Sequence, residues 1–195
     1  MSKKPLIIST DPGIDDVAAM TISFFADELD VKMIVPTWGN VSLEHTLQNT
    51  LDLENFLHTK VPVVKGANQP LVRPAISAAS VHGETGIAGF EFEKASDELL
   101  EPGLAATKMY ETIKNSPEKV TLLGVGPLTD FALLFKQYPD VVENIAEVYI
   151  MGGNIGHGNH SPFAEYNIAG DPEAAQIVFH SGLPVYVAPL EIGDK

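Results

Sequence analysis

Short apolar runs alternate along this chain with longer stretches in which apolar residues recur every three or four positions. Runs rich in Val, Ile and Leu predict strands, whereas the three-to-four spacing predicts amphipathic helices. The predicted strands cover residues 5–9, 31–36, 61–64, 120–124, 148–151 and 184–188. The predicted helices cover residues 15–25, 43–58, 104–115, 128–137 and 172–180.

Nearly every predicted strand is apolar at consecutive positions, instead of alternating between apolar and polar residues. This pattern is typical of parallel strands that helices cover on both faces. The regular alternation of strand and helix therefore predicts an α/β fold with an open, mostly parallel, doubly wound sheet. The sequence shows no internal repeat and no convincing linker, so residues 1–195 are expected to form a single α/β domain.

Residues 65–97 interrupt this alternation. The segment is rich in Gly, Ala, Ser and Pro, and it contains the sequence His82-Gly83-Glu84-Thr85-Gly86. Long irregular connections in compact domains are often functional loops or flaps. His82 is therefore the best histidine candidate for contacting a ligand or donating a proton to a leaving group. The other histidines are expected to be packing or solvated residues.

The composition narrows the classes of function. A formal net charge of −14 disfavours nucleic acid and anionic membranes as partners, because both bind basic surfaces. The absence of cysteine excludes disulfides, zinc–thiolate sites and thiol catalysis, and it fits a cytoplasmic location. The apolar run near the start is too short for a signal peptide, and no stretch has the length of a membrane span. A small ligand or a metal ion is the expected partner.

Three carboxylates crowd the end of the first predicted strand, in the sequence Thr10-Asp11-Pro12-Gly13-Ile14-Asp15-Asp16. Two unit charges about 4 Å apart repel by roughly 1 kcal/mol in water and roughly 4 kcal/mol at a surface-like dielectric. A hard cation or a shared proton usually offsets such repulsion. Helix capping explains Asp15 or Asp16 taken singly, but a cap needs only one carboxylate. Asp171, which precedes a proline, is by contrast fully explained as a helix cap.

Further polar residues follow other predicted strands, and they belong to four stretches: Gly39-Asn40, Gly124-Val125-Gly126-Pro127, Met151-Gly152-Gly153-Asn154, and the loop that holds Asn159, Glu165 and Asn167. Ligands of open parallel sheets bind beyond the carboxyl ends of the strands, so these stretches are expected to meet at one rim. One anionic acceptor and two amides suit a polyhydroxylated ligand. A cation held by carboxylates and a carbonyl can bind sugar hydroxyls and acidify a water beside a carboxylate base.

Taken together, these motifs resemble the nucleoside hydrolases of the inosine–uridine-preferring family. The resemblance runs through essentially the whole chain and rests on six stretches: Asp11-Pro12-Gly13-Ile14-Asp15-Asp16, Gly39-Asn40, His82-Gly83-Glu84-Thr85-Gly86, Gly126-Pro127-Leu128-Thr129, Met151-Gly152-Gly153, and Ala164-Glu165-Tyr166-Asn167 with Asp171-Pro172-Glu173-Ala174-Ala175. It implies hydrolysis of the N-glycosidic bond of ribonucleosides, to ribose and free base, by a calcium-bound water. It also implies a role in purine and pyrimidine salvage and assembly into a homo-oligomer.

The resemblance further implies a role for each matching position. Asp11, Asp16 and the backbone carbonyl of Val125 would ligate Ca²⁺. Asp11 would also take a proton from the attacking water, and His82 would lie near the nucleobase as the second catalytic residue. The ribose would be bound by six residues: Asp15, Asn40, Met151, Asn159, Glu165 and Asn167.

Three places depart from the family's pattern. Ser9 stands where an aspartate is usual, Asp130 stands where an asparagine is common, and residues 190–194 replace a segment closer to Leu-Asp-Val-Thr-His. The resemblance also implies that a typical member continues past Lys195, with one further aspartate ligand and a histidine that helps the base leave. The domain is therefore expected to be truncated at its C-terminus.

Two alternatives stay open at this point. One is a catalytically impaired or inactive fragment that at most binds calcium or ribose, which the early end and Ser9 favour. The other is a magnesium phosphohydrolase, which the missing glycine-rich phosphate loop with lysine disfavours. The sequence does not decide between purine and pyrimidine nucleosides.

Overall fold

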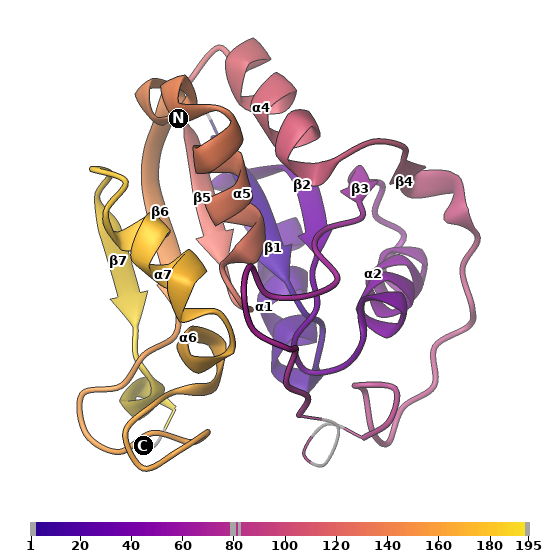
Figure 1. The fold of residues 1–195 in the computed structure, drawn as a ribbon. Helices are drawn as coiled ribbons and strands as arrows, with labels where there is room; N and C mark the ends of the chain where they lie inside the picture. The colour runs from indigo at the N-terminus through magenta and orange to yellow at the C-terminus, as the bar shows by residue number, and fades with distance from the viewer. Residues whose placement is uncertain (1–2, 79–80, 82, 194–195) are drawn as a thin grey trace.

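The structure, a computed structural model, describes residues 3–78, 81 and 83–193. Its strands are β1 (Lys4–Thr10), β2 (Leu29–Pro36), β3 (Val63–Val64), β4 (Leu100–Glu101), β5 (Val120–Gly124), β6 (Ile145–Met151) and β7 (Val185–Ala188). Within the described range they form one seven-stranded sheet in the order β4-β3-β2-β1-β5-β6-β7, and every neighbouring pair is parallel (Figure 1). The chain thus winds outward from β1 to β4, returns to the centre, and winds outward again from β5 to β7.

The helices connect these parallel strands. They are α1 (Ile14–Phe25), α2 (Leu43–Leu57), α4 (Ala105–Asn115), α5 (Thr129–Gln137), α6 (Tyr166–Gly170) and α7 (Pro172–Phe179), with 3-10 helices η1 (Asp97–Leu99), η2 (Pro139–Asn144) and η3 (Leu190–Ile192). The predicted open, parallel α/β sheet is confirmed. No helix in the described part of the chain is long and apolar enough to cross a membrane.

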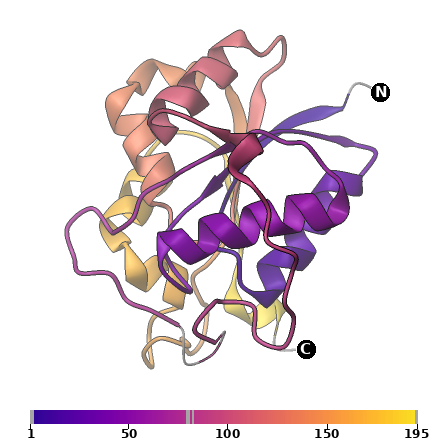
Figure 2. The same ribbon diagram turned by 90° about the vertical axis from the view of Figure 1, so that its right-hand side faces the viewer.

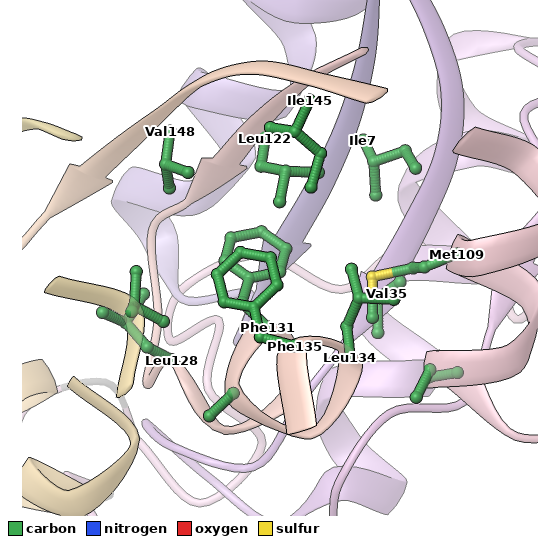
Figure 3. Packing of buried hydrophobic residues seen from close by; sticks show 14 of the residues in the cluster. Ile7, Val35, Met109, Leu122, Leu128, Phe131, Leu134, Phe135, Ile145 and Val148 are labelled. Carbon is green, nitrogen blue, oxygen red and sulfur yellow. The ribbon is translucent and has the colours of Figure 1, made fainter. Parts of the chain in front are cut away.

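The main hydrophobic core lies between the sheet and the layer formed by α4, α5 and α7 (Figure 3). Ile7, Leu122 and Val148 project from three strands, and each is fully buried. They meet Phe131 of α5 and Met109 of α4, which are also fully buried. Burying side chains of this size stabilises the fold by about 1.5–3 kcal/mol each relative to exposure. This layer fixes the strand tips relative to one another.

The opposite face of the sheet is covered by α1 and α2 over β1–β3, where Met20, Ile34 and Leu53 form a smaller core. Figure 2 shows α2 lying across this end of the molecule. Over β6 and β7 the same face is open: Tyr149 and Tyr186 are 40% and 50% exposed, and their rings stack with centroids 4.9 Å apart. The expected helices on both faces are present, but the second layer covers only part of the sheet.

Several element ends differ from the sequence prediction. The strand predicted at 61–64 shortens to two residues, because Pro62 has no N–H to donate to a neighbouring strand. His58 follows α2 in the left-handed conformation, with φ 54°, and therefore ends the helix that was predicted to include it. The two-residue β4 and the five-residue α6 were not predicted, because they are too short to show a periodic pattern.

Asp171 caps α7, as predicted, but it has a wider role than that prediction gave it. Its Oδ1 accepts a hydrogen bond from the Ala174 N–H at 3.0 Å, which is the cap. Its Oδ2 accepts from the Leu71 N–H at 2.9 Å and from the Thr129 hydroxyl at 2.8 Å. The Thr129 hydroxyl in turn accepts from the Trp38 indole N–H at 3.0 Å. One buried carboxylate therefore joins α7, α5, the chain after β3 and the tip of β2.

Replacing Asp171 with alanine is expected to lower the free energy of unfolding by ~3 kcal/mol, because it removes the cap and leaves buried donors without an acceptor. Urea denaturation of the Asp171→Ala variant measures this loss. The control is Glu173→Ala in the same helix, which removes an exposed ion pair with Arg73 and should cost less than ~1 kcal/mol. Equal losses in the two variants would contradict the network.

Candidate active site

Four of the expected site residues lie at the carboxyl ends of four adjacent strands. Asp11 follows β1, Asn40 follows β2, Val125 follows β5, and Met151 ends β6. The strand order reverses between β1 and β5, since the chain leaves β1 towards β2 and later returns to β5 on the other side. Open α/β sheets bind ligands at this kind of reversal point.

Asp11 is buried, with 1% of its surface exposed. Its Oδ2 accepts a hydrogen bond from the Asn40 N–H at 2.7 Å, and the Asn40 side-chain amide donates to its backbone carbonyl at 3.0 Å. Its Oδ1 is buried and has no hydrogen-bond partner within the described residues. The Asp11 carboxylate lies against the backbone of two glycines, Gly39 and Gly126. A Cβ at either position would collide with it, so both positions require glycine. The backbone N–H of Asn40 thus holds Oδ2 of Asp11, whereas Oδ1 receives no hydrogen bond from the described residues.

Asp16 lies beside Asp11 and is 4% exposed. Its Oδ1 accepts from the Thr10 hydroxyl at 2.8 Å, and its Oδ2 accepts from the Gly13 N–H at 2.9 Å. The Asn40 amide also reaches its Oδ2 at 3.3 Å, so one amide group contacts both aspartates. The bond from Gly13 is a helix cap, and the capping interpretation therefore accounts for part, but not all, of the environment of Asp16.

The positions of Asp11 and Asp16 disfavour the charged forms of both carboxylates. Burial raises the pKa of Asp11 well above its ordinary value, and the nearby charge of Asp16 raises it further. Burial likewise raises the pKa of Asp16 to about 7, with the charge of Asp15 adding to the effect. None of the ion pairs in the described part of the chain includes Asp11 or Asp16. Within that part, only hydrogen bonds from neutral groups offset the cost of burying the two charges.

The chemistry of these groups fits a hard cation. The unpartnered Oδ1 of Asp11, the remaining lone pair of Asp16 and the carbonyl of Val125 are oxygen ligands of the kind that Ca²⁺ and Mg²⁺ bind. Asp15 is exposed, and the described residues contain no group of three or more His, Cys, Asp or Glu placed to hold a metal ion. The described residues therefore offer part of a coordination sphere, which water or hydroxyl oxygens would complete.

Glu165 and Asn167 tie the tips of β5 and β6 to α6. Glu165 is 2% exposed and caps α6: its Oε1 accepts from the Asn167 N–H at 2.8 Å, and its Oε2 accepts from the Ile168 N–H at 3.1 Å. The Asn167 side-chain amide donates to the carbonyls of Val125 at 3.0 Å and Met151 at 3.2 Å. Four of the expected site residues are thus in one hydrogen-bonded group beside the aspartates.

The remaining expected site residues are less tightly held. Asn159 is exposed, and its Oδ1 accepts from the Tyr166 N–H at 2.8 Å. Asp15 points to solvent in the first turn of α1. His82 lies outside the described residues, so its role stays a prediction.

The glycine-rich segment after His82 does lie beside the aspartate turn. The side-chain amide of Asn49, in α2, donates to the carbonyl of Pro12 at 3.1 Å and to that of Thr85 at 2.8 Å. Gly86 has φ +90°, and a Cβ there would crowd the Pro12 carbonyl at 3.2 Å. The segment that the sequence marked as a flap is therefore brought to the same rim.

Sequence reasoning assigned no role to three residues that shape this rim. Thr10 holds Asp16, Asn49 holds the flap segment, and Tyr166 donates from its hydroxyl to the carbonyl of Gly39 at 2.8 Å. Thr10 and Tyr166 lie within the stretches Thr10–Asp16 and Ala164–Asn167 that the sequence singles out, which is a usable signal. Asn49 lies mid-helix at no marked position, and nothing in the sequence pointed to it.

A family model described as inosine-uridine preferring nucleoside hydrolase matches residues 6–195. The chain belongs to this family. It is 47% identical over 192 residues to the non-specific ribonucleoside hydrolase RihC of Klebsiella pneumoniae, and 44% identical to a RihC of Salmonella. These alignments cover 98% and 97% of this chain but only 62% of each relative, so the chain spans less than two thirds of their length.

Solved structures of nucleoside hydrolases share the fold. The purine-preferring ribonucleoside hydrolase from Gardnerella vaginalis superposes with a TM-score of 0.91 at 30% identity, covering 96% of this chain and 61% of that one. The plant nucleoside hydrolase PpNRh1 gives 0.88 at 31% identity, covering 97% and 61%. The family that the resemblance implied and the parallel sheet that the hydrophobic pattern predicted are both confirmed.

When no divalent cation is present, raising the pH is expected to destabilise this nucleoside hydrolase chain. Unfolded aspartate titrates near pKa 3.9, whereas the folded pKa of Asp16 is about 7, so the folded state binds more protons between these values. The free energy of unfolding therefore falls as the pH rises through this range, by an amount on the order of 3 kcal/mol. Urea denaturation in a chelator across the range measures it.

The Asp16→Asn variant should show a flatter pH dependence, because it removes the titrating group but keeps an acceptor oxygen. Asp97→Asn, which removes an exposed carboxylate, should behave like the parent chain. A dependence that survives unchanged in Asp16→Asn would contradict this account of the buried carboxylates.

Proposed function

We propose that this chain carries the site that hydrolyses the N-glycosidic bond of ribonucleosides, releasing ribose and the free base. The observation that carries the proposal is the buried Asp11 carboxylate at the reversal point of a nucleoside hydrolase sheet. One of its oxygens has no hydrogen-bond partner among the described residues, and Asp16 lies beside it. Membership of the family and the names of the relatives support the reaction class. Because the chain spans only 62% of those relatives, its own activity is part of the proposal.

We propose Ca²⁺ as the cofactor, held by Asp11, Asp16 and the carbonyl of Val125. Calcium accepts six to eight oxygen ligands in flexible geometry, which suits a site where the described residues offer few ligands and sugar and water oxygens would supply the others. When bound, the ion supplies positive charge that offsets the two carboxylates, orients vicinal hydroxyls and acidifies a nearby water.

In this proposal the chain's own residues perform the remaining steps. Asp11 accepts a proton from water through Oδ1 as the water oxygen bonds to the anomeric carbon and the carbon–nitrogen bond breaks. The departing base takes up a proton, for which His82 is the proposed donor. The transition state has oxocarbenium character, so the adjacent carboxylates stabilise it electrostatically.

The sugar would be bound by residues that the structure holds at the rim. Three N–H groups orient the Glu165 carboxylate, which leaves one lone pair, on Oε1, that can accept from a ribose hydroxyl. Asn40 and Asn167 are fixed by their own amide donors, and their carbonyl oxygens would face the ligand. Asp15 and Asn159, both exposed, would reach the sugar from the rim. Met151 would line the pocket.

A second candidate is a protein that binds calcium or ribose without turnover. The observation favouring it is that the described residues hold no group of three or more His, Cys, Asp or Glu placed to bind a metal ion, so the proposed site has two buried carboxylates.

The proposed hydrolase function includes a cytoplasmic role in nucleoside salvage and self-association into a homo-oligomer. Both are drawn from the family resemblance.

Incubation of the chain with calcium and either inosine or uridine is expected to release ribose, measured as reducing sugar. Asp11→Ala should reduce the rate by at least ~10²-fold, as loss of a general base typically does. Asp97→Asn should release ribose at the rate of the parent chain. A rate of ribose release that changes neither with calcium nor with the Asp11 substitution would contradict the proposal. Calorimetric calcium binding without any ribose release would favour the second candidate.

A further inference from the structure

The side chain of Tyr166 links two segments that are 127 residues apart in the sequence. Tyr166 opens α6, and its hydroxyl donates to the carbonyl of Gly39, beyond the end of β2, at 2.8 Å. That carbonyl belongs to the peptide group whose N–H is contributed by Asn40. This N–H donates to Oδ2 of Asp11 at 2.7 Å. A single peptide group therefore connects the phenol of Tyr166 to the carboxylate of Asp11.

The peptide group between Gly39 and Asn40 has little freedom to rotate. The backbone of Gly39 lies so close to Asp11 that a Cβ would collide with the carboxylate. The Asn40 side chain adds bonds to the Asp11 carbonyl at 3.0 Å and to Asp16 at 3.3 Å. Rotating the peptide plane would break the bonds to Tyr166 and Asp11 together. Its orientation thus sets where Oδ2 of Asp11 lies, and with it the direction of the unpartnered Oδ1.

Tyr166 is itself held in place. Its N–H donates to Asn159 Oδ1 at 2.8 Å, and its ring meets His160 edge-on with centroids 6.0 Å apart. Burial raises the pKa of Tyr166 far above its ordinary value, with the charges of Asp11 and Glu165 adding to the effect. The hydroxyl therefore keeps its proton and remains a donor.

We propose that Tyr166 is a positioning residue, whose hydroxyl orients Asp11 through the Gly39–Asn40 peptide group. A hydrogen bond accepted at a carbonyl polarises the peptide and strengthens the N–H on its other side as a donor. Tyr166 thereby strengthens the Asn40 to Asp11 bond without touching the carboxylate. The relay is a property of the fold, whereas its consequence for catalysis rests on the proposed function.

The Tyr166→Phe variant removes the hydroxyl and keeps the ring. The Asn40 backbone amide proton, read by nuclear magnetic resonance in the cation-free chain, is expected to move upfield, because its bond to the Asp11 carboxylate weakens. The matched control is Tyr138→Phe, which removes a hydroxyl that lies 2.9 Å from the Thr107 hydroxyl. It should leave the Asn40 amide where it is. An Asn40 amide that stays in place in Tyr166→Phe, or moves equally in both variants, would overturn the proposal.

A second readout is functional. Outer-shell groups typically change metal affinity or activity by 10–100-fold, so Tyr166→Phe should weaken calcium binding or slow ribose release by roughly tenfold. Tyr138→Phe should change neither. If the parent chain releases no ribose while the Asn40 amide still moves in Tyr166→Phe, the proposed function fails and the positioning role stands. If ribose release is normal in Tyr166→Phe and the amide does not move, the positioning role alone fails.

Discussion

Burial of Asp11 and Asp16 side by side, with no cationic side chain paired to either within the described residues, is the constraint around which this molecule is arranged. Removing carboxylates from water penalises their charged form, and the two charges add repulsion. Backbone and amide groups from the turn after β1 and from Asn40 donate hydrogen bonds to the two carboxylates. Those donors hold the pair in place, but they do not neutralise it, and the proposal of a bound divalent cation rests on this imbalance.

Other buried carboxylates of this chain make the contrast clear. Asp171 accepts from three donors, and Glu165 accepts from three backbone N–H groups. Both oxygens of Asp130 receive the Ala67 N–H, at 3.0 and 3.2 Å. These groups connect loops to helices, and each has both oxygens bonded. Asp11 differs from these three, because its Oδ1 is buried without a hydrogen-bond partner among the described residues, as Oε1 of Glu54 in α2 also is. Asp11 differs from Glu54 in turn, because a second buried carboxylate, Asp16, raises its pKa further and because it lies at the reversal point of the sheet. The proposed cation site rests on this combination.

Much of the fold could be predicted from the sequence, because apolar β-branched runs and helical spacing are local signals that parallel α/β sheets share. The rim could also be located, since Asp11, Asn40 and Val125 each follow a strand and parallel strands end on one side. The contacts within the rim could not. That Glu165 caps α6, or that Tyr166 reaches Gly39, depends on how distant segments approach in space, and α6 is too short to show a periodic pattern. The expected role of His82 stays a prediction, because this residue lies outside the described range.

Proton release on calcium binding is the most direct test of the central claim, that the aspartate pair carries a raised affinity for protons which a divalent cation displaces. Calcium is titrated into the chain near the pKa of Asp16, about 7, in two buffers of different ionisation enthalpy. The observed heat is expected to depend on the buffer, because protons leave the pair as the ion binds, and Asp16→Asn is expected to reduce this dependence. Calcium binding with no proton release, or no binding at all, would contradict the claim.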